Sequence, residues 1–176
     1  MTKIICISGL VGSGKDTVAD LVAKKLGFNR VKLTFKDAAK QKGLSLMEYH
    51  AYVEKDLTID REFDKMVGKE ARKSDSVLST WLGAWLIPEA VLRVWLDASQ
   101  KTRAERISKR DNMGIRQAIK HVQDRDNHNR GRYLALYSID IFVHSNFDLQ
   151  INTEKFTPEQ VADIVVAAYK AKEGKV

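Results

Sequence analysis

This chain of 176 residues has little of several residue types that mark other classes of protein. Its one cysteine, Cys6, supports no disulfide framework, which needs at least two cysteines. No apolar run approaches the length of about 18 residues that a membrane span needs. The four histidines show no metal-ligand spacing, and the sequence has neither a CxxC nor an HExxH motif. These absences argue against a disulfide-rich secreted domain, a membrane-spanning protein and a histidine or cysteine metal site.

The hydrophobic content and the excess of Lys and Arg predict one globular domain with basic character. Hydrophobic residues make up 44% of the chain, which suits a single domain with a sizeable core. Residues 1–3 lead straight into an apolar run, so we expect no signal peptide and a cytoplasmic protein. The net charge of +7 suits nucleic acid, a membrane surface or small phosphorylated ligands. Much of the excess lies in seven arginines: Arg103, Arg106, Arg110, Arg116, Arg125, Arg130 and Arg132.

The strongest motif is the glycine-rich run GLVGSGKDT at residues 9–17, between an apolar run and an amphipathic segment. A strand, a glycine-rich turn and a helix form a phosphate-binding P-loop, because backbone N–H groups and the helix N-terminus point at the phosphates. The residues expected to bind the nucleotide phosphates are Gly9, Gly12, Ser13, Gly14, Lys15, Asp16 and Thr17. Such motifs usually carry Ser or Thr directly after the lysine, as a ligand of Mg²⁺. Here Asp16 stands at that position, and we expect Thr17 and Asp16 near the metal.

Apolar periodicity predicts an alternation of strands and helices along the chain. The expected strands are residues 4–7, 76–80, 91–96 and 147–152, and the expected later helices are residues 98–110, 114–125, 133–139 and 159–172. Gly27 is expected to cap the first helix, and the polar run at residues 124–131 is expected to break the helical segment around it. This alternation predicts an α/β domain with a parallel sheet. The expected core is residues 1–33, 75–111 and 133–176, with an acceptor-binding insert at 34–74 and a lid at 112–132.

Several stretches, in the same order along the chain, resemble the archaeal type of cytidylate kinase. They are the P-loop, then FKDAAKQKGLSLMEYHAYVEKDLTIDREFD, VWLDASQKTRAERISKRD, DRDNHNRGRY, YSIDI and FDLQINTEKFTPEQV. The resemblance implies a P-loop kinase fold, with a five-stranded parallel sheet flanked by helices, a helical monophosphate-binding insert and a short lid. It implies transfer of the γ-phosphoryl group of ATP, with Mg²⁺, to a nucleoside monophosphate, CMP or dCMP being the expected acceptor. It implies catalytic roles for Lys15, Arg106, Arg110, Arg125 and Arg132.

The acceptor side departs from the family pattern. Asp60 and Arg61 match the family, but the family's Glu-Gly-Arg run falls on residues 79–81, which read Ser-Thr-Trp. The run Arg-Val-Lys at residues 30–32 also replaces a Ser-x-Gly turn. We expect Lys36, Asp60, Arg61 and Trp81 at the acceptor, although Lys36 could be a surface lysine and Trp81 a core residue. Either Asp16 or Asp97 could replace the missing metal-binding glutamate.

These departures keep two alternatives open. One is a kinase of the same fold that acts on another small acceptor. The other is a nucleotide-binding protein with weak or no catalysis, which could also bind nucleic acid through its basic surface. The expected partners remain small nucleotides, with no membrane, and the expected state is a monomer.

Overall fold

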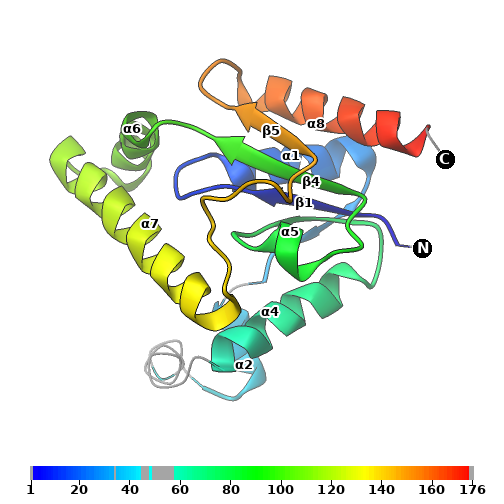
Figure 1. Cartoon of the computed structure of the whole chain (residues 1–176), viewed down its shortest axis with the longest axis horizontal. Coiled ribbons are helices and arrows are strands. Elements are labelled where there is room, and N and C mark those ends of the chain that lie inside the picture. Colours follow the sequence, from blue (N-terminus) through cyan, green and yellow to red (C-terminus); the bar gives the residue numbers. More distant parts are fainter. Residues whose placement is uncertain (1, 34, 45–47, 49–57, 175–176) are drawn as a thin grey trace.

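The computed structural model describes residues 2–33, 35–44, 48 and 58–174 of the chain. Within them five strands form one parallel sheet in the order β2-β3-β1-β4-β5 (Figure 1). The strands are β1 (Ile4–Ser8), β2 (Asn29–Val31), β3 (Ser76–Ser79), β4 (Leu92–Asp97) and β5 (Leu149–Asn152). The predicted five-stranded parallel sheet and the four strands located from the sequence are confirmed. The carboxyl ends of all the strands therefore meet at one edge, where ligands of open α/β sheets bind.

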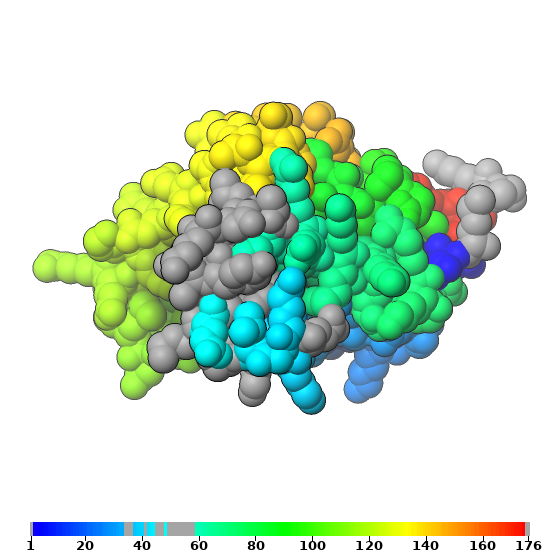
Figure 2. All heavy atoms as spheres, turned by 90° about the horizontal axis from the view of Figure 1, so that it is seen from below, coloured from blue at the N-terminus to red at the C-terminus, as the bar shows by residue number. Residues whose placement is uncertain are grey.

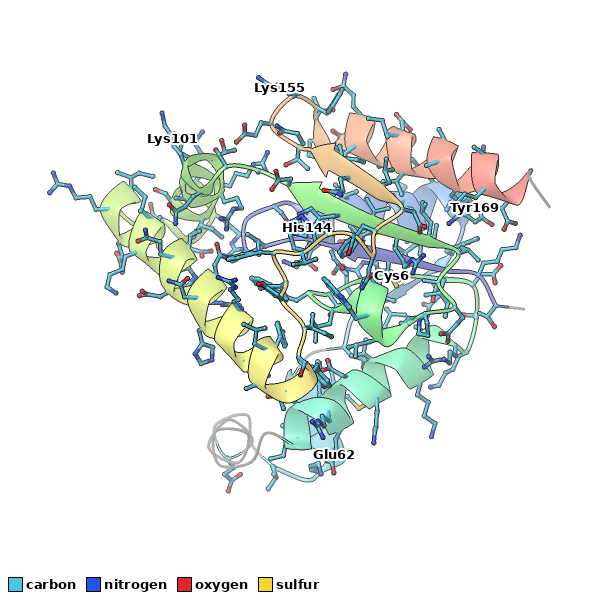
Figure 3. All side chains as sticks on the ribbon, in the orientation of Figure 1. Cys6, Glu62, Lys101, His144, Lys155 and Tyr169 are labelled. Atoms are coloured by element: carbon cyan, nitrogen blue, oxygen red, sulfur yellow. The ribbon has the colours of Figure 1, made fainter. Side chains whose placement is uncertain are left out.

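The central strand β1 is buried on both faces, so its side chains alternate between two cores. Ile5 and Ile7 pack in the core beneath α1 (Lys15–Leu26) and α8 (Pro158–Glu173). Ile4 and Cys6 belong to the opposite core, which includes residues of α4 (Thr58–Ala71) and α5 (Gly83–Leu86). Figure 3 shows Cys6 beside α5, and Gly83 makes this approach possible, since an added Cβ would lie 2.9 Å from the Cβ of Cys6.

Local capping signals in the sequence set several helix ends. Gly27 ends α1 in the left-handed conformation with φ 68°, as predicted. Ser99 caps α6 (Gln100–Asp111) by accepting a hydrogen bond from the Thr102 N–H. Thr157 and Gln160 form a capping box at the start of α8, where Pro158 takes the first helical position.

The predicted break at residues 124–131 is wrong. Helix α7 (Ile115–Tyr137) runs through this segment without interruption. Asp126, in the middle of the polar run, is buried and forms an ion pair with buried Arg103 of α6, with 2.8 Å between Nη2 and Oδ2. A tertiary contact therefore keeps the helix intact where the local propensity of Asn, Asp and Gly is low.

Helix α4, which belongs to the expected insert, packs against the end of α7. The described helices of the insert are α2 (Phe35–Gln41) and α4, and residues 34, 45–47 and 49–57 lie outside the described residues. Arg132 donates to Asp60 over 2.7 Å between Nε and Oδ2, and the Tyr137 hydroxyl donates to Asp64 over 2.6 Å. Figure 2 shows α4 and α7 as adjoining parts of one surface. In the parts of the chain described above, no helix is both long and apolar enough to cross a membrane.

Candidate active site

The glycine-rich turn at residues 9–14 links β1 to α1 at the carboxyl edge of the sheet. Gly12 and Gly14 adopt left-handed φ values of 79° and 91°, which side chains disfavour. A Cβ on Gly12 would also lie 2.8 Å from the carbonyl oxygen of Arg103. Lys15 is the first residue of α1, so it lies at the positive end of the helix. The turn has the backbone conformation expected of a phosphate-binding loop, and phosphate binding by its residues stays a prediction.

A cavity of about 540 Å³ opens over this turn. The loop and helix residues from Val11 to Val18 line one side, and among them are the predicted residues Gly12, Ser13, Gly14, Lys15, Asp16 and Thr17. Three arginines, Arg106, Arg110 and Arg125, lie at its wall. Phe156, Pro158 and Val161 add apolar surface from the segment after β5. The cavity thus joins a cationic region to an apolar one, as a nucleotide requires.

Lys15 is half-buried at the centre of this site. Burial lowers the pKa of its ammonium group, Arg125 and Arg110 add to that effect, and neighbouring Asp16 opposes it. Its Nζ lies 5.3 Å from the centre of the Trp81 ring. Trp81 itself packs against the apolar cluster that contains Val11 and Ile107. The structure therefore places Trp81 in the core wall beside the lysine, and its contact with a base stays a prediction.

Two arginines of α6 bind the backbone of the glycine-rich turn. Arg106 donates to the carbonyl oxygens of Gly12 and Ser13, each over 3.3 Å, and to Thr153 Oγ1 over 2.9 Å. Arg103 donates to the carbonyl oxygen of Val11 over 3.1 Å and pairs with Asp126. Arg106 thus holds the loop from the cavity wall. Sequence reasoning missed this role of Arg103, although its spacing of three residues from Arg106 puts both on one helix face.

Arg110 and Arg125 differ from this pair because both are exposed. Arg110 forms an ion pair with its neighbour Asp111, with 2.7 Å between Nε and Oδ1. For Arg125 the structure gives no ion pair within the described ranges. Both lie close enough to Lys15 to lower its pKa. Lys15, Arg110 and Arg125 thus lie together at the cavity, and their contact with a phosphate chain stays a prediction.

The remaining predicted residues take other places. Asp60 is almost fully buried, at 2% exposure, and pairs with Arg132. Arg61 donates to the carbonyl oxygen of Leu136 over 2.6 Å. None of the three lines the cavity, and together they fasten the insert to α7. The side chain of Lys36 lies outside the described residues, so its role stays a prediction.

The carboxylate of Asp16 is exposed at the cavity wall beside Thr17. The Ser79 hydroxyl, at the carboxyl end of β3, donates to its Oδ1. Asp97 ends β4 but does not line the cavity, so the geometry favours Asp16 over Asp97 for a metal. The described residues hold no cluster of three or more His, Cys, Asp or Glu side chains that could bind a metal. A carboxylate and a hydroxyl still fit Mg²⁺, which binds such sites through one or two carboxylates together with substrate phosphates.

A parallel sheet, a glycine-rich turn with its lysine and converging arginines define the class of P-loop kinases. The fold is shared with solved structures: an uncharacterized protein from Eubacterium ventriosum has a TM-score of 0.74 at 16% identity, over 96% of this chain and 99% of that chain. A shikimate kinase from Acinetobacter baumannii, in complex with shikimate, has a TM-score of 0.63 at 13% identity, over 97% and 94%.

Sequence comparison narrows the class to a family. The model of the cytidylate kinase-like family matches residues 4–155, and the chain belongs to this family. It is 41% identical over 167 residues to the cytidylate kinase of Pyrococcus horikoshii, covering 94% of this chain and 87% of that protein. It is 36% identical over 168 residues to the cytidylate kinase of Sulfurisphaera tokodaii, covering 93% of each.

Proposed function

We propose that this protein transfers the γ-phosphoryl group of ATP to CMP or dCMP, forming ADP and the nucleoside diphosphate. The observation that carries this proposal is the convergence of Lys15, Arg110 and Arg125 on the cavity above the glycine-rich turn. The relatives named cytidylate kinase supply the acceptor class. Phosphoryl transfer needs little chemistry beyond positioning and stabilisation of negative charge, and this site offers both.

We propose one orientation for the donor nucleotide in the cavity. Its phosphates would accept hydrogen bonds from the N–H groups of residues 12–17, and its base would lie against Phe156 and Pro158. Arg103 and Arg106 keep the loop carbonyls turned away from the phosphates, because they hydrogen-bond to the carbonyls of Val11, Gly12 and Ser13. In this orientation Lys15 lies beside the β- and γ-phosphates.

Thr17 and Asp16 would hold Mg²⁺ at the phosphate end, with Asp16 replacing the carboxylate that is missing at position 79. When bound, the ion neutralises phosphate charge and orients the transferring group. Asp16 would bind a water molecule of the ion's shell, since it lies one residue before the Thr17 hydroxyl. This arrangement moves the acidic group from the end of β3 to the start of α1.

The insert would supply the acceptor site. The Asp60–Arg132 ion pair and the Tyr137–Asp64 hydrogen bond fix α4 against α7. Lys36 and Trp81 are proposed to contact the acceptor from the insert and from the end of β3. We propose the same division of the chain as the sequence analysis, with residues 34–74 as insert and residues 112–132 as the region that covers the phosphates.

The test is an ADP-release assay with ATP, Mg²⁺ and the acceptors CMP, dCMP, UMP, AMP, GMP and dTMP. We expect turnover with CMP or dCMP, reduced about 100-fold or more in Lys15→Ala. The matched control is Lys101→Ala, which removes an exposed lysine of α6 and should leave turnover unchanged (Figure 3). Turnover with another acceptor alone would assign a different substrate. ATP binding without turnover of any acceptor would contradict the proposal.

A further inference from the structure

Arg30 reaches from the edge strand β2 toward the carboxyl end of β3. Its side chain is only 12% exposed, and each of the three guanidinium nitrogens donates to a protein acceptor. Nε donates to Asp20 Oδ1 over 2.8 Å, Nη1 donates to the carbonyl oxygen of Val31, and Nη2 donates to Ser79 Oγ over 2.7 Å. Arg30 is therefore held in one position by α1, β2 and β3 together.

The hydrogen bonds at Ser79 have only one possible direction. A guanidinium donates and never accepts, so the Ser79 oxygen must be the acceptor from Arg30. The single proton of the Ser79 hydroxyl is then free to point at Asp16 Oδ1, to which it donates. Arg30 Nη2 also lies 3.4 Å from the same Oδ1. Within the described residues every polar contact of Asp16 uses Oδ1, and Oδ2 takes part in none.

Asp20 anchors this network from α1. Its Oδ1 accepts from Arg30 and its Oδ2 accepts from Lys32 over 2.8 Å. Burial acts to raise the pKa of Asp20, but the hydrogen bonds from Lys32 and Arg30 outweigh it and hold the pKa below its usual value. Arg30, Lys32 and Ser79 are positions where the chain departs from the family pattern, and the structure joins all three through one network.

We propose that Arg30 is a positioning residue that acts through Ser79 to hold Asp16 in the orientation in which Oδ2 binds the Mg²⁺ shell. This inference rests on the proposed function, in which Asp16 serves the metal. A direct role of Arg30 at the acceptor is disfavoured, because its nitrogens already have protein acceptors and it does not line the cavity. A residue that orients a metal-binding group in this way typically changes metal affinity about 10- to 100-fold when it is replaced.

The experiment titrates Mn²⁺ into the complex of the full chain with ADP, followed by electron paramagnetic resonance. Arg30→Met, which keeps length but loses the hydrogen bonds, should weaken Mn²⁺ binding about 10-fold or more. The Kd of metal-free ADP and the KM of CMP should stay within about twofold of wild type. The matched control is Arg72→Met, which removes an exposed arginine paired with Glu89 and should change none of these values.

A double mutant separates positioning from a direct effect. Asp16→Asn alone should weaken Mn²⁺ binding, and Arg30→Met should add little in that background, because coupled residues are not additive. If Arg30→Met fails to fold, two milder variants test the same network. Arg30→Lys alters the donor itself, and Asp20→Asn weakens the anchor of Arg30 on α1. Higher KM for CMP with unchanged Mn²⁺ affinity would overturn the proposal and assign Arg30 to the acceptor. Unchanged Mn²⁺ affinity in Asp16→Asn would overturn it as well.

The Mn²⁺ titration does not depend on turnover. If wild type fails to phosphorylate any monophosphate but Arg30→Met still weakens Mn²⁺ binding through Asp16, the proposed function fails while the role of Arg30 stands. If CMP is phosphorylated and Arg30→Met leaves Mn²⁺ binding unchanged, the proposed function stands and the role of Arg30 fails.

Discussion

Replacing Arg103 with methionine tests how the glycine-rich turn is held. Arg103 is 5% exposed and Asp126 is 6% exposed, so the change would leave a carboxylate buried without its cation. Asp126 Oδ1 already has no hydrogen-bond partner within the described residues, so Oδ2 depends on this arginine. Arg103→Met also removes the donors to the carbonyl oxygens of Val11 and Ala98.

The expected loss in the free energy of unfolding is about 3–5 kcal/mol, the usual effect of breaking a buried ion pair by removing one partner. This is a large part of the roughly 5–15 kcal/mol that stabilises a typical domain. The double variant Arg103→Met/Asp126→Leu removes both charges and should recover to within about 2 kcal/mol of wild type, because the buried carboxylate is gone. Arg103→Met should also reduce ATP affinity, and the double variant should not restore it, since the carbonyl oxygen of Val11 loses its donor in each.

The assay is urea unfolding of the full chain followed by circular dichroism, with ATP binding measured by calorimetry. Arg72→Met is the matched control, and its exposed ion pair with Glu89 predicts a loss below about 1 kcal/mol. A loss below 1 kcal/mol in Arg103→Met, or additive losses in the double variant, would refute the reasoning. ATP affinity restored by the second substitution would show that the turn does not need Arg103.

Two further changes test the insert and the turn. Burial raises the pKa of Asp64 from 3.8 to about 6, although the hydrogen bond from Tyr137 acts to lower it. The folded state therefore loses stability as the pH rises from 3.8, because the buried carboxyl must ionise, and this loss is complete above pH 6. Asp64→Asn should therefore raise the free energy of unfolding in urea at pH 8 by at most about 3 kcal/mol, and leave it unchanged near pH 3. Gly12→Ala should lose about 1–2 kcal/mol of stability and most ATP affinity, because its φ is 79° and its Cβ would clash with Arg103. Gly114→Ala, where a Cβ meets nothing within 4 Å, should be neutral in the same measurements.

The parts of the fold that the sequence predicted carry their signal locally. The turn at residues 9–17 is recognised by glycines and a lysine at fixed spacing. Gly27 is recognised because glycine readily adopts the left-handed backbone conformation that ends α1. Strand β2 escaped a residue-level prediction because it has three residues and only Val31 is buried. The break predicted in α7 was wrong because Asp126 is stabilised by Arg103, which lies 23 positions earlier in the chain. No local pattern contains that contact.

The arginines of the candidate site show the same limit. The sequence shows where these arginines stand, but it does not show which role each one has, because arginines close together in the sequence have different partners in the structure. Arg103 and Arg106 bind loop carbonyls, whereas Arg110, on the same helix, is exposed at the cavity wall. Arg132, predicted to act at the phosphates, pairs with Asp60 of the insert instead.

This division bears on what the positive charge of the chain is for. A protein that binds nucleic acid through its surface presents a continuous basic stripe of exposed side chains. Here Arg103, Arg130 and Arg132 are each neutralised by a carboxylate, and Arg106 is turned toward backbone oxygens. Lys15, Arg110 and Arg125 gather at one cavity of nucleotide size, where Arg110 also pairs with Asp111. The grouping of these cations at the cavity favours a small phosphorylated ligand there, and it predicts that raising salt weakens ATP binding through only a few charges.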